Sequence, residues 1–172
     1  MLDSIITSKT RVRLLVKFFI NAANTSHLRG LATEFKESTN AIRKELNNLS
    51  EAGYLEKENI QNRIQYKANI KHPLFKSLQE IVRKYLGLDT IVEQVLGRMG
   101  DISQIVLIGD YAKGLDSGLI EVIIVGNNLN EEYLNKINPK IEALIQRKVK
   151  FQLSESAINE GLIVFENKDM AN

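Results

Sequence analysis

The residues best suited to recognition chemistry lie close together, at positions 38 to 44. They are Ser38, Thr39, Asn40, Arg43 and Lys44. An Asn amide can form two hydrogen bonds with adenine and an Arg guanidinium two with guanine, whereas hydroxyl and ammonium groups suit phosphates better. We therefore expect Asn40 or Arg43 to contact a base edge, and the other three residues to contact phosphates.

A helix must hold these side chains in place. Ser38 is a good N-cap for a helix over 39–52, and Gly53 follows where a left-handed residue commonly ends a helix. The apolar stripe that would anchor this helix consists of Ile42, Leu46 and Leu49. The pattern predicts a helix whose N-terminal turn is polar and basic while its other face is buried.

The surrounding elements complete a small DNA-binding layout. Two earlier helices are predicted over 9–20 and 28–35, the second with Ser26 as its N-cap. After Gly53 the residues alternate, which predicts strands at 54–57 and 63–67. Three helices and a hairpin form a winged helix-turn-helix, whose third helix enters the major groove of double-stranded DNA.

The hairpin contributes two further cations, Arg63 and Lys67. We expect them near a flanking phosphate backbone or minor groove. His27 and His72 are the only histidines and the chain has no cysteine, so a zinc site is not expected. We read His27 as a residue at a helix start and His72 as a loop residue.

Charge divides the chain into unlike halves. Residues 1–86 hold 15 Lys and Arg against 8 Asp and Glu, a net charge of +7, and residues 87–172 hold 8 against 13, a net charge of −5. The first half therefore has the electrostatics of a polyanion binder. Charge alone does not distinguish DNA from RNA or a membrane surface.

Composition adds two expectations. The chain has 172 residues, 44% of them hydrophobic and 26% charged, which is typical of a globular protein with one ordinary domain or two small ones. The lack of cysteine fits a reducing compartment, and no long uncharged stretch is present. We expect a cytoplasmic protein with no membrane partner.

The fold class expected is α+β, in three parts. Residues 1–70 form the winged helix-turn-helix, 71–100 a helical connector or dimerisation element, and 101–172 a small α/β domain. Within the last part the pattern predicts strands at 105–108, 120–125, 149–153 and 162–165, and a loop at 109–118. It also predicts a helix over 130–146 that restarts near Pro139.

The stretch STNAIRKELNNLSEAGYLEKE resembles the recognition helix and first wing strand of winged-helix transcriptional regulators, of the kind grouped with the arsenic-repressor and multiple-antibiotic-resistance families. The resemblance covers about residues 9–70, and Leu49, Gly53 and Leu55 match the turn from recognition helix into wing. It implies binding to double-stranded DNA as a homodimer on a palindromic site.

The stretch IVLIGDYAKGLDSGLIEVIIVG resembles the signature of minimal nucleotidyltransferases. Five residues match in order: Gly109, Tyr111, Ala112, Lys113 and Gly114. In that family the glycine turn holds phosphates, and two aspartates on the next strand bind the divalent ions used in phosphoryl transfer. The resemblance implies a nucleotide site at Gly109, Asp110, Lys113 and Gly114.

The same stretch departs from the family where the chemistry is done. Leu119 and Glu121 fall at the two aspartate positions, and Asp110 replaces a phosphate-facing serine. The strand that should supply a third acid offers Lys150 and Gln152. Because two-metal transfer needs these carboxylates, we expect no enzymatic activity, no catalytic residue and no cofactor.

Several alternatives stay open. Asp110, Asp116 and Glu121 could form a rearranged metal site that binds magnesium or nucleotide without turnover, or the glycines could serve only as turns. The leading hypothesis is a DNA-binding regulator whose degenerate second domain serves sensing, docking to a protein partner or dimerisation. The others are an active nucleotidyltransferase with a winged-helix substrate-binding module, and a protein-interaction scaffold.

Overall fold

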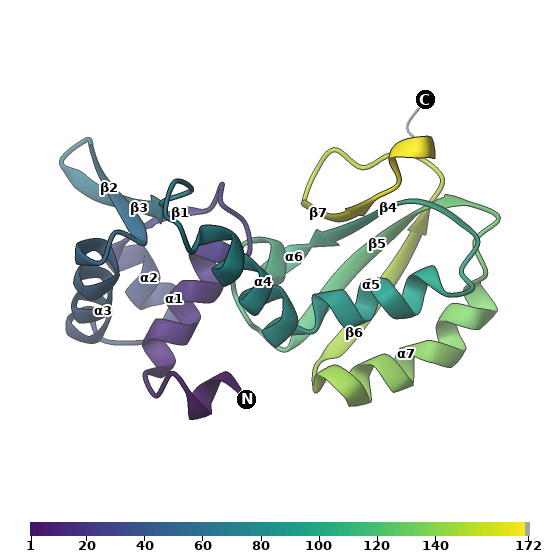
Figure 1. Cartoon of the computed structure of the whole chain (residues 1–172), viewed down its shortest axis with the longest axis horizontal. Coiled ribbons are helices and arrows are strands. Elements are labelled where there is room, and N and C mark those ends of the chain that lie inside the picture. Colours follow the sequence, from purple (N-terminus) through teal and green to yellow (C-terminus); the bar gives the residue numbers. More distant parts are fainter. Residues whose placement is uncertain (171–172) are drawn as a thin grey trace. The chain divides into compact units, whose positions relative to one another are not determined.

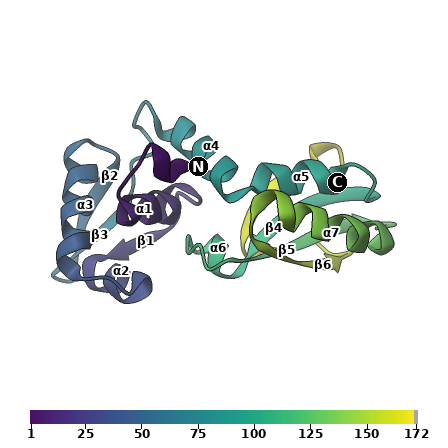
Figure 2. The same ribbon diagram turned by 90° about the horizontal axis from the view of Figure 1, so that it is seen from below.

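The structure, a computed structural model, describes residues 1–170. It is a mixed α+β chain, in agreement with the expected class, and it divides into two compact units at the boundary between Val82 and Arg83 (Figures 1 and 2). The stretch 71–100, predicted as a connector, is shared between these units. Each unit is described separately below.

The first unit contains three complete α-helices, a short 3-10 helix, the first part of a fourth α-helix and a three-stranded sheet. Its elements are η1 (Leu2–Ser4), α1 (Lys9–Phe19), β1 (Thr25–His27), α2 (Leu28–Phe35), α3 (Thr39–Glu51), β2 (Leu55–Ile60), β3 (Arg63–Ala68) and the first part of α4 (Phe75–Leu86). The sheet is antiparallel, in the order β1-β3-β2. Between β2 and β3, Gln61 and Asn62 have φ of 49° and 62°, the left-handed pair that closes a two-residue hairpin.

The ends of α3 follow the sequence prediction. The Ser38 hydroxyl accepts a hydrogen bond from the Ala41 N–H (3.3 Å), and Gly53 has φ of +80°. Ile42 and Leu46 of the predicted stripe are fully buried, and Leu49 is nearly so. The local sequence therefore places α3 with its N-terminal turn exposed.

The predicted cap of α2 is wrong. Ser26 lies in β1, opposite Tyr66 of β3, and His27 precedes α2 without a side-chain cap. The strand prevails because β3 supplies backbone hydrogen bonds from 40 positions away in the register Ser26↔Tyr66. This pairing fixes the start of α2 beside the hairpin.

Ion pairs tie α1 to the helix-turn-helix. Glu45 of α3 accepts hydrogen bonds from Arg11 Nε (2.8 Å) and the Ser8 hydroxyl (2.7 Å). Lys17 Nζ lies 2.9 Å from Glu34 of α2. Because both acids lie on the faces of α2 and α3 that meet α1, these contacts set the orientation of the two helices.

The Glu45 contacts predict acid sensitivity of the first unit. Burial raises the pKa of Glu45, but the hydrogen bonds from Arg11 and Ser8 and the Arg11 charge outweigh it, so the net pKa is lowered. The stabilisation is therefore complete above the unfolded pKa, about 4.3 for Glu, and is lost as the pH falls from there through the lowered pKa of the folded state. We expect Glu45→Gln to cost about 1 kcal/mol near neutral pH, because Arg11 is partly exposed. Thermal unfolding should show the gap between wild type and variant closing as the pH falls; a constant gap would contradict this.

The second unit is a four-stranded sheet with two helices on one face. Its elements are the end of α4, α5 (Leu88–Leu96), β4 (Asp101–Ile108), α6 (Gly109–Ala112), β5 (Leu119–Asn127), α7 (Glu131–Ile145), β6 (Lys148–Ser154), β7 (Leu162–Glu166) and η2 (Lys168–Met170). The strand order is β6-β5-β4-β7, with β5 and β6 parallel and the other pairs antiparallel. Both views show α5 and α7 on the same face of this sheet (Figures 1 and 2).

Two details differ from the sequence prediction. The segment 109–118 is not all loop, because α6 occupies its first four residues. Pro139 does not restart a helix, since α7 runs unbroken through it. Proline has no N–H, so the Asn135 carbonyl, four residues earlier, lacks its helical hydrogen-bond donor. Both residues are exposed, so a water molecule can donate to this carbonyl instead.

Candidate nucleic-acid interface

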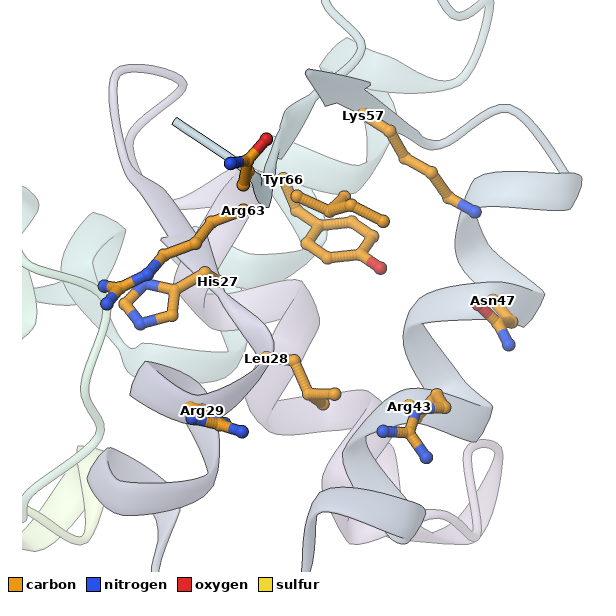
Figure 3. Close-up of a pocket in the computed structure, with 10 residues that line it drawn as sticks. His27, Leu28, Arg29, Arg43, Asn47, Lys57, Arg63 and Tyr66 are labelled. Carbon is orange, nitrogen blue, oxygen red and sulfur yellow. The ribbon is translucent and has the colours of Figure 1, made fainter. Parts of the chain in front are cut away.

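A groove of about 630 Å³ lies in the first unit between α3, the start of α2 and the β2–β3 hairpin. Its walls are mostly polar and cationic (Figure 3). The residues that line it are His27, Leu28, Arg29, Arg43, Asn47, Lys57, Asn62, Arg63, Ile64 and Tyr66.

The α3 wall offers base-reading groups. Arg43 and Asn47 stand one turn apart on α3 and both line the groove (Figure 3). Asn40, a further turn toward the N-terminus, accepts a long hydrogen bond from Arg43 Nη1 at Oδ1 (3.4 Å). Asn40, Arg43 and Asn47 therefore share one exposed face of the helix.

The other predicted α3 residues lie around this face. Ser38 and Thr39 are exposed at the helix start, where the Ser38 hydroxyl is engaged as the cap. Lys44 is exposed but does not line the groove. These three residues flank the groove and do not enter it.

The two cations predicted on the β2–β3 hairpin, Arg63 and Lys67, have different surroundings in the structure. Arg63 lines the groove together with His27 (Figure 3). Lys67 instead pairs with Glu56 at 3.6 Å. Lys67 lies opposite Glu56 in the β2–β3 register and is not among the residues that line the groove.

The charges of the first unit are segregated. The groove wall carries four cations, Arg29, Arg43, Lys57 and Arg63, and no acid. The acids that form described ion pairs in this unit lie elsewhere: Glu34, Glu37 and Glu45 pair with α1, and Glu56 pairs with Lys67. The groove is therefore a site of positive potential bordered by hydrogen-bonding amides.

Tyr66 forms part of the groove floor. Burial raises the pKa of its phenol, and the nearby Arg43 charge only partly offsets that shift. The hydroxyl therefore stays neutral and adds no negative charge to the groove.

Of the ten lining residues, sequence reasoning assigned only Arg43 and Arg63 to the interface; those that it missed include Arg29, Asn47, Lys57 and Tyr66. Asn47 could have been found from its position four residues after Arg43 on the predicted helix. Lys57 and Tyr66 face each other across the hairpin, which requires the strand register. Arg29 is brought in by the pairing of β1 with β3, which lacks a local signal.

The loop predicted to bind nucleotide in the second unit is held in place by hydrogen bonds of Asp116. Asp110 and Lys113 are exposed, and Gly109 and Gly114 have φ of +67° and +81°. Asp116 is bound bidentately by Arg147, at 3.0 Å from Nε and 2.6 Å from Nη2, and also accepts a hydrogen bond from the Tyr111 hydroxyl. Asp116 thus joins the loop to the residue preceding β6.

The Asp116 cluster is partly buried and strongly polar. Burial and the Asp116 carboxylate raise the pKa of Tyr111, and the hydrogen bonds to Asp116 raise that of Arg147. The Arg147 guanidinium also stacks on the Tyr85 ring at 5.1 Å. Tyr111 and Arg147 therefore keep their protons. Their hydrogen bonds to Asp116 hold the loop against the start of β6.

Glu121, another of the three acids considered for a metal site, lies opposite Lys150 in the β5–β6 register, with 4.0 Å between Oε1 and Nζ. Asp116 and Glu121 are thus each matched by a cation. Within residues 1–170 there is no cluster of three His, Cys, Asp or Glu arranged to hold a metal ion.

Comparison with known proteins gives distant likenesses. No family model matches the chain, and no curated protein matches it. Among solved structures, it is similar to the AntR antimony-specific transcriptional repressor, with 23% identity over 54% of this chain and 75% of that chain and a TM-score of 0.38. It is also similar to Sso10a-2, a DNA-binding protein from Sulfolobus solfataricus, with 16% identity over 49% of this chain and 90% of that chain and a TM-score of 0.34.

The helices within residues 1–170 include none with the length and apolar character needed to cross a membrane.

Proposed function

We propose that this protein binds double-stranded DNA through the groove of its first unit and acts as a transcriptional regulator. The observation that carries the proposal is the groove itself, whose wall holds four cations and no acid beside an exposed helix face. A duplex presents phosphates to cations and base edges to Asn and Arg side chains, and this wall supplies both. The two solved structures to which the chain is similar are described as a repressor and a DNA-binding protein.

The two walls suggest a division of roles. Asn40, Arg43 and Asn47 lie on the helix face that would enter the major groove, so we assign them to base edges. The remaining cations, Arg29, Lys57 and Arg63, would contact phosphates on either side. Sequence preference would then come from α3 and most of the affinity from the other walls.

A salt titration tests the phosphate contacts. We expect Lys57→Ala to weaken binding to all duplexes and to reduce the slope of log affinity against log salt by about 1. Lys76→Ala is the matched control, because Lys76 is exposed on α4 and does not line the groove. Equal slopes for the two variants, measured by fluorescence anisotropy, would contradict the placement of DNA in the groove.

We further propose that the second unit has no nucleotidyltransferase activity and serves sensing, docking or dimerisation. Support comes from Glu121, which faces Lys150 where a third acid would be required, and from Asp116, which is bound by Arg147. Leu119, at the other aspartate position, cannot bind a cation.

A labelling experiment tests whether the second unit has nucleotidyltransferase activity. Incubation with magnesium and each labelled nucleoside triphosphate should transfer no label to protein, RNA or small molecules. Transfer that disappears in Glu121→Ala would instead establish the enzyme, with the winged helix as a substrate-binding module.

We also propose that the protein acts as a homodimer, as the resemblance to winged-helix regulators implies. Two copies related by a two-fold axis would place two grooves on the two halves of a palindromic site, about one helical turn apart. Footprinting on a selected duplex would show two equal protected half-sites.

A further inference from the structure

The strand β6 forms one edge of the sheet in the second unit, and its outer side is only partly covered. In a parallel pair, alternate residues direct both backbone groups toward the neighbouring strand and the others direct both away. The Lys148 N–H donates to the Gly118 carbonyl on the β5 side (2.9 Å), so Val149, Phe151 and Leu153 present their backbone groups outward.

Only one of these three residues is capped. The Val149 N–H donates to Glu142 Oε1 (2.9 Å), and Asn138 Nδ2 donates to the Val149 carbonyl (3.1 Å). In the part of the chain that the structure describes, the outward backbone groups of Phe151 and Leu153 have no hydrogen-bond partner. The edge is therefore closed at Val149 and open over Phe151–Leu153.

The opposite edge, β7, is protected from pairing. Its register against β4 shifts at Val164, and the Val164 carbonyl accepts a hydrogen bond from Arg83 Nη2 (3.1 Å). Bulges and capped carbonyls keep a strand edge from adding another strand. β6 has an unbroken register with β5 and lacks this protection over Phe151–Leu153.

We propose that β6 pairs with β6 of a second copy of this chain, antiparallel and centred on Gln152. In that register Phe151 lies opposite Leu153 of the second copy, and Leu153 opposite its Phe151. Since these are the open residues, each pair exchanges two backbone hydrogen bonds and the capped groups of Val149 are not needed. Two sheets of four strands would become one continuous sheet across the two-fold axis.

The side chains of β6 are compatible with this register. Lys150 falls opposite Ser154, so no like charges face each other, and the two Gln152 amides meet at the axis. Lys148 and Lys150 are already matched by Glu142 and Glu121 of their own copy. The lysines of β6 therefore add no repulsion across the strand pair.

A hollow beside the open edge offers room for the Phe151 and Leu153 side chains that would face each other across the strand pair. It has a volume of about 380 Å³ and lies between α7 and β6, with Leu134, Phe151 and Leu153 among its lining residues. Leu153 is 38% exposed in the single chain. Pairing would remove this apolar surface from water, which adds to the backbone hydrogen bonds.

A cysteine experiment tests the register, because the chain has no cysteine of its own. Opposed residues that do not exchange hydrogen bonds have Cα atoms about 4.5 Å apart, within the range of a disulfide. We expect Gln152→Cys to form a covalent dimer at least about tenfold faster than Lys150→Cys, whose two copies would be about 13 Å apart. Both positions are exposed, so both variants should fold. Equal cross-linking rates on non-reducing gels would overturn the proposal.

Sedimentation of the unmodified chain, without DNA, gives a second test. We expect a concentration-dependent dimer that Leu153→Pro reduces to monomer, because proline removes an outward N–H and leaves the β5–β6 ladder intact. Leu153→Ala, which keeps the N–H, should still dimerise, more weakly. A wild-type chain that stays monomeric would overturn the pairing. Both tests omit DNA, so failure here is distinct from failure of DNA binding by the first unit.

Discussion

Replacing Arg43 with alanine is expected to remove most of the protein's discrimination between DNA sequences. Arg43 lines the groove from α3, next to Asn47 and in hydrogen-bond reach of Asn40. A bidentate contact to a base contributes about 1 to 3 kcal/mol of discrimination, and its loss leaves the phosphate contacts in place. The affinity for a selected duplex should therefore fall toward the affinity for random DNA.

The measurement starts with selection of bound fragments from random DNA, followed by titration of selected and random duplexes. Lys44→Ala is the matched variant, because Lys44 is the next residue of α3, is exposed and flanks the groove, where the sequence predicts a phosphate contact. It should weaken selected and random duplexes alike. If Arg43→Ala also weakened both equally, Arg43 would be a phosphate contact and the assignment of α3 to base edges would be wrong.

Replacing Asp116 with alanine is expected to destabilise the second unit by about 3 kcal/mol. The change leaves the Arg147 guanidinium and the Tyr111 hydroxyl without their shared acceptor, and Tyr111 is fully buried. The Arg147 and Asp116 side chains are 13% and 25% exposed, so we take the lower end of the range for breaking a buried ion pair.

Thermal unfolding followed by circular dichroism measures this loss. Glu121→Gln is the control, since its contact with the well-exposed Lys150 should contribute less than about 0.5 kcal/mol. A loss for Asp116→Ala no larger than the control's would contradict the bracing role. If Asp116 were a magnesium ligand instead, magnesium would raise the melting temperature of the wild type and not of Asp116→Ala.

How much the sequence could predict depends on how far apart the interacting residues lie. The cap at Ser38, the stripe on α3 and the turn at Gly53 are local signals, and all three were predicted correctly. β1 was missed because its partner strand lies 40 positions away, and the pairing of Asp116 with Arg147 spans 31 positions. Charge counts identified the basic half, but only the β2–β3 register shows that Lys67 lies opposite Glu56 and pairs with it, while Arg63 lines the groove.

The separation of charges in the first unit has a consequence for how the protein meets its target. The acids beside α1 are neutralised by the cations of α1, whereas the residues that line the groove include four cations and no acid, so the positive charge of the unit is concentrated at the groove and the unit has an electric dipole. A polyanion approaching such a body exerts a torque on it before contact, so productive orientations are enriched among encounters. The ion pairs that hold α1 in place would thereby also help to turn the groove toward an approaching duplex.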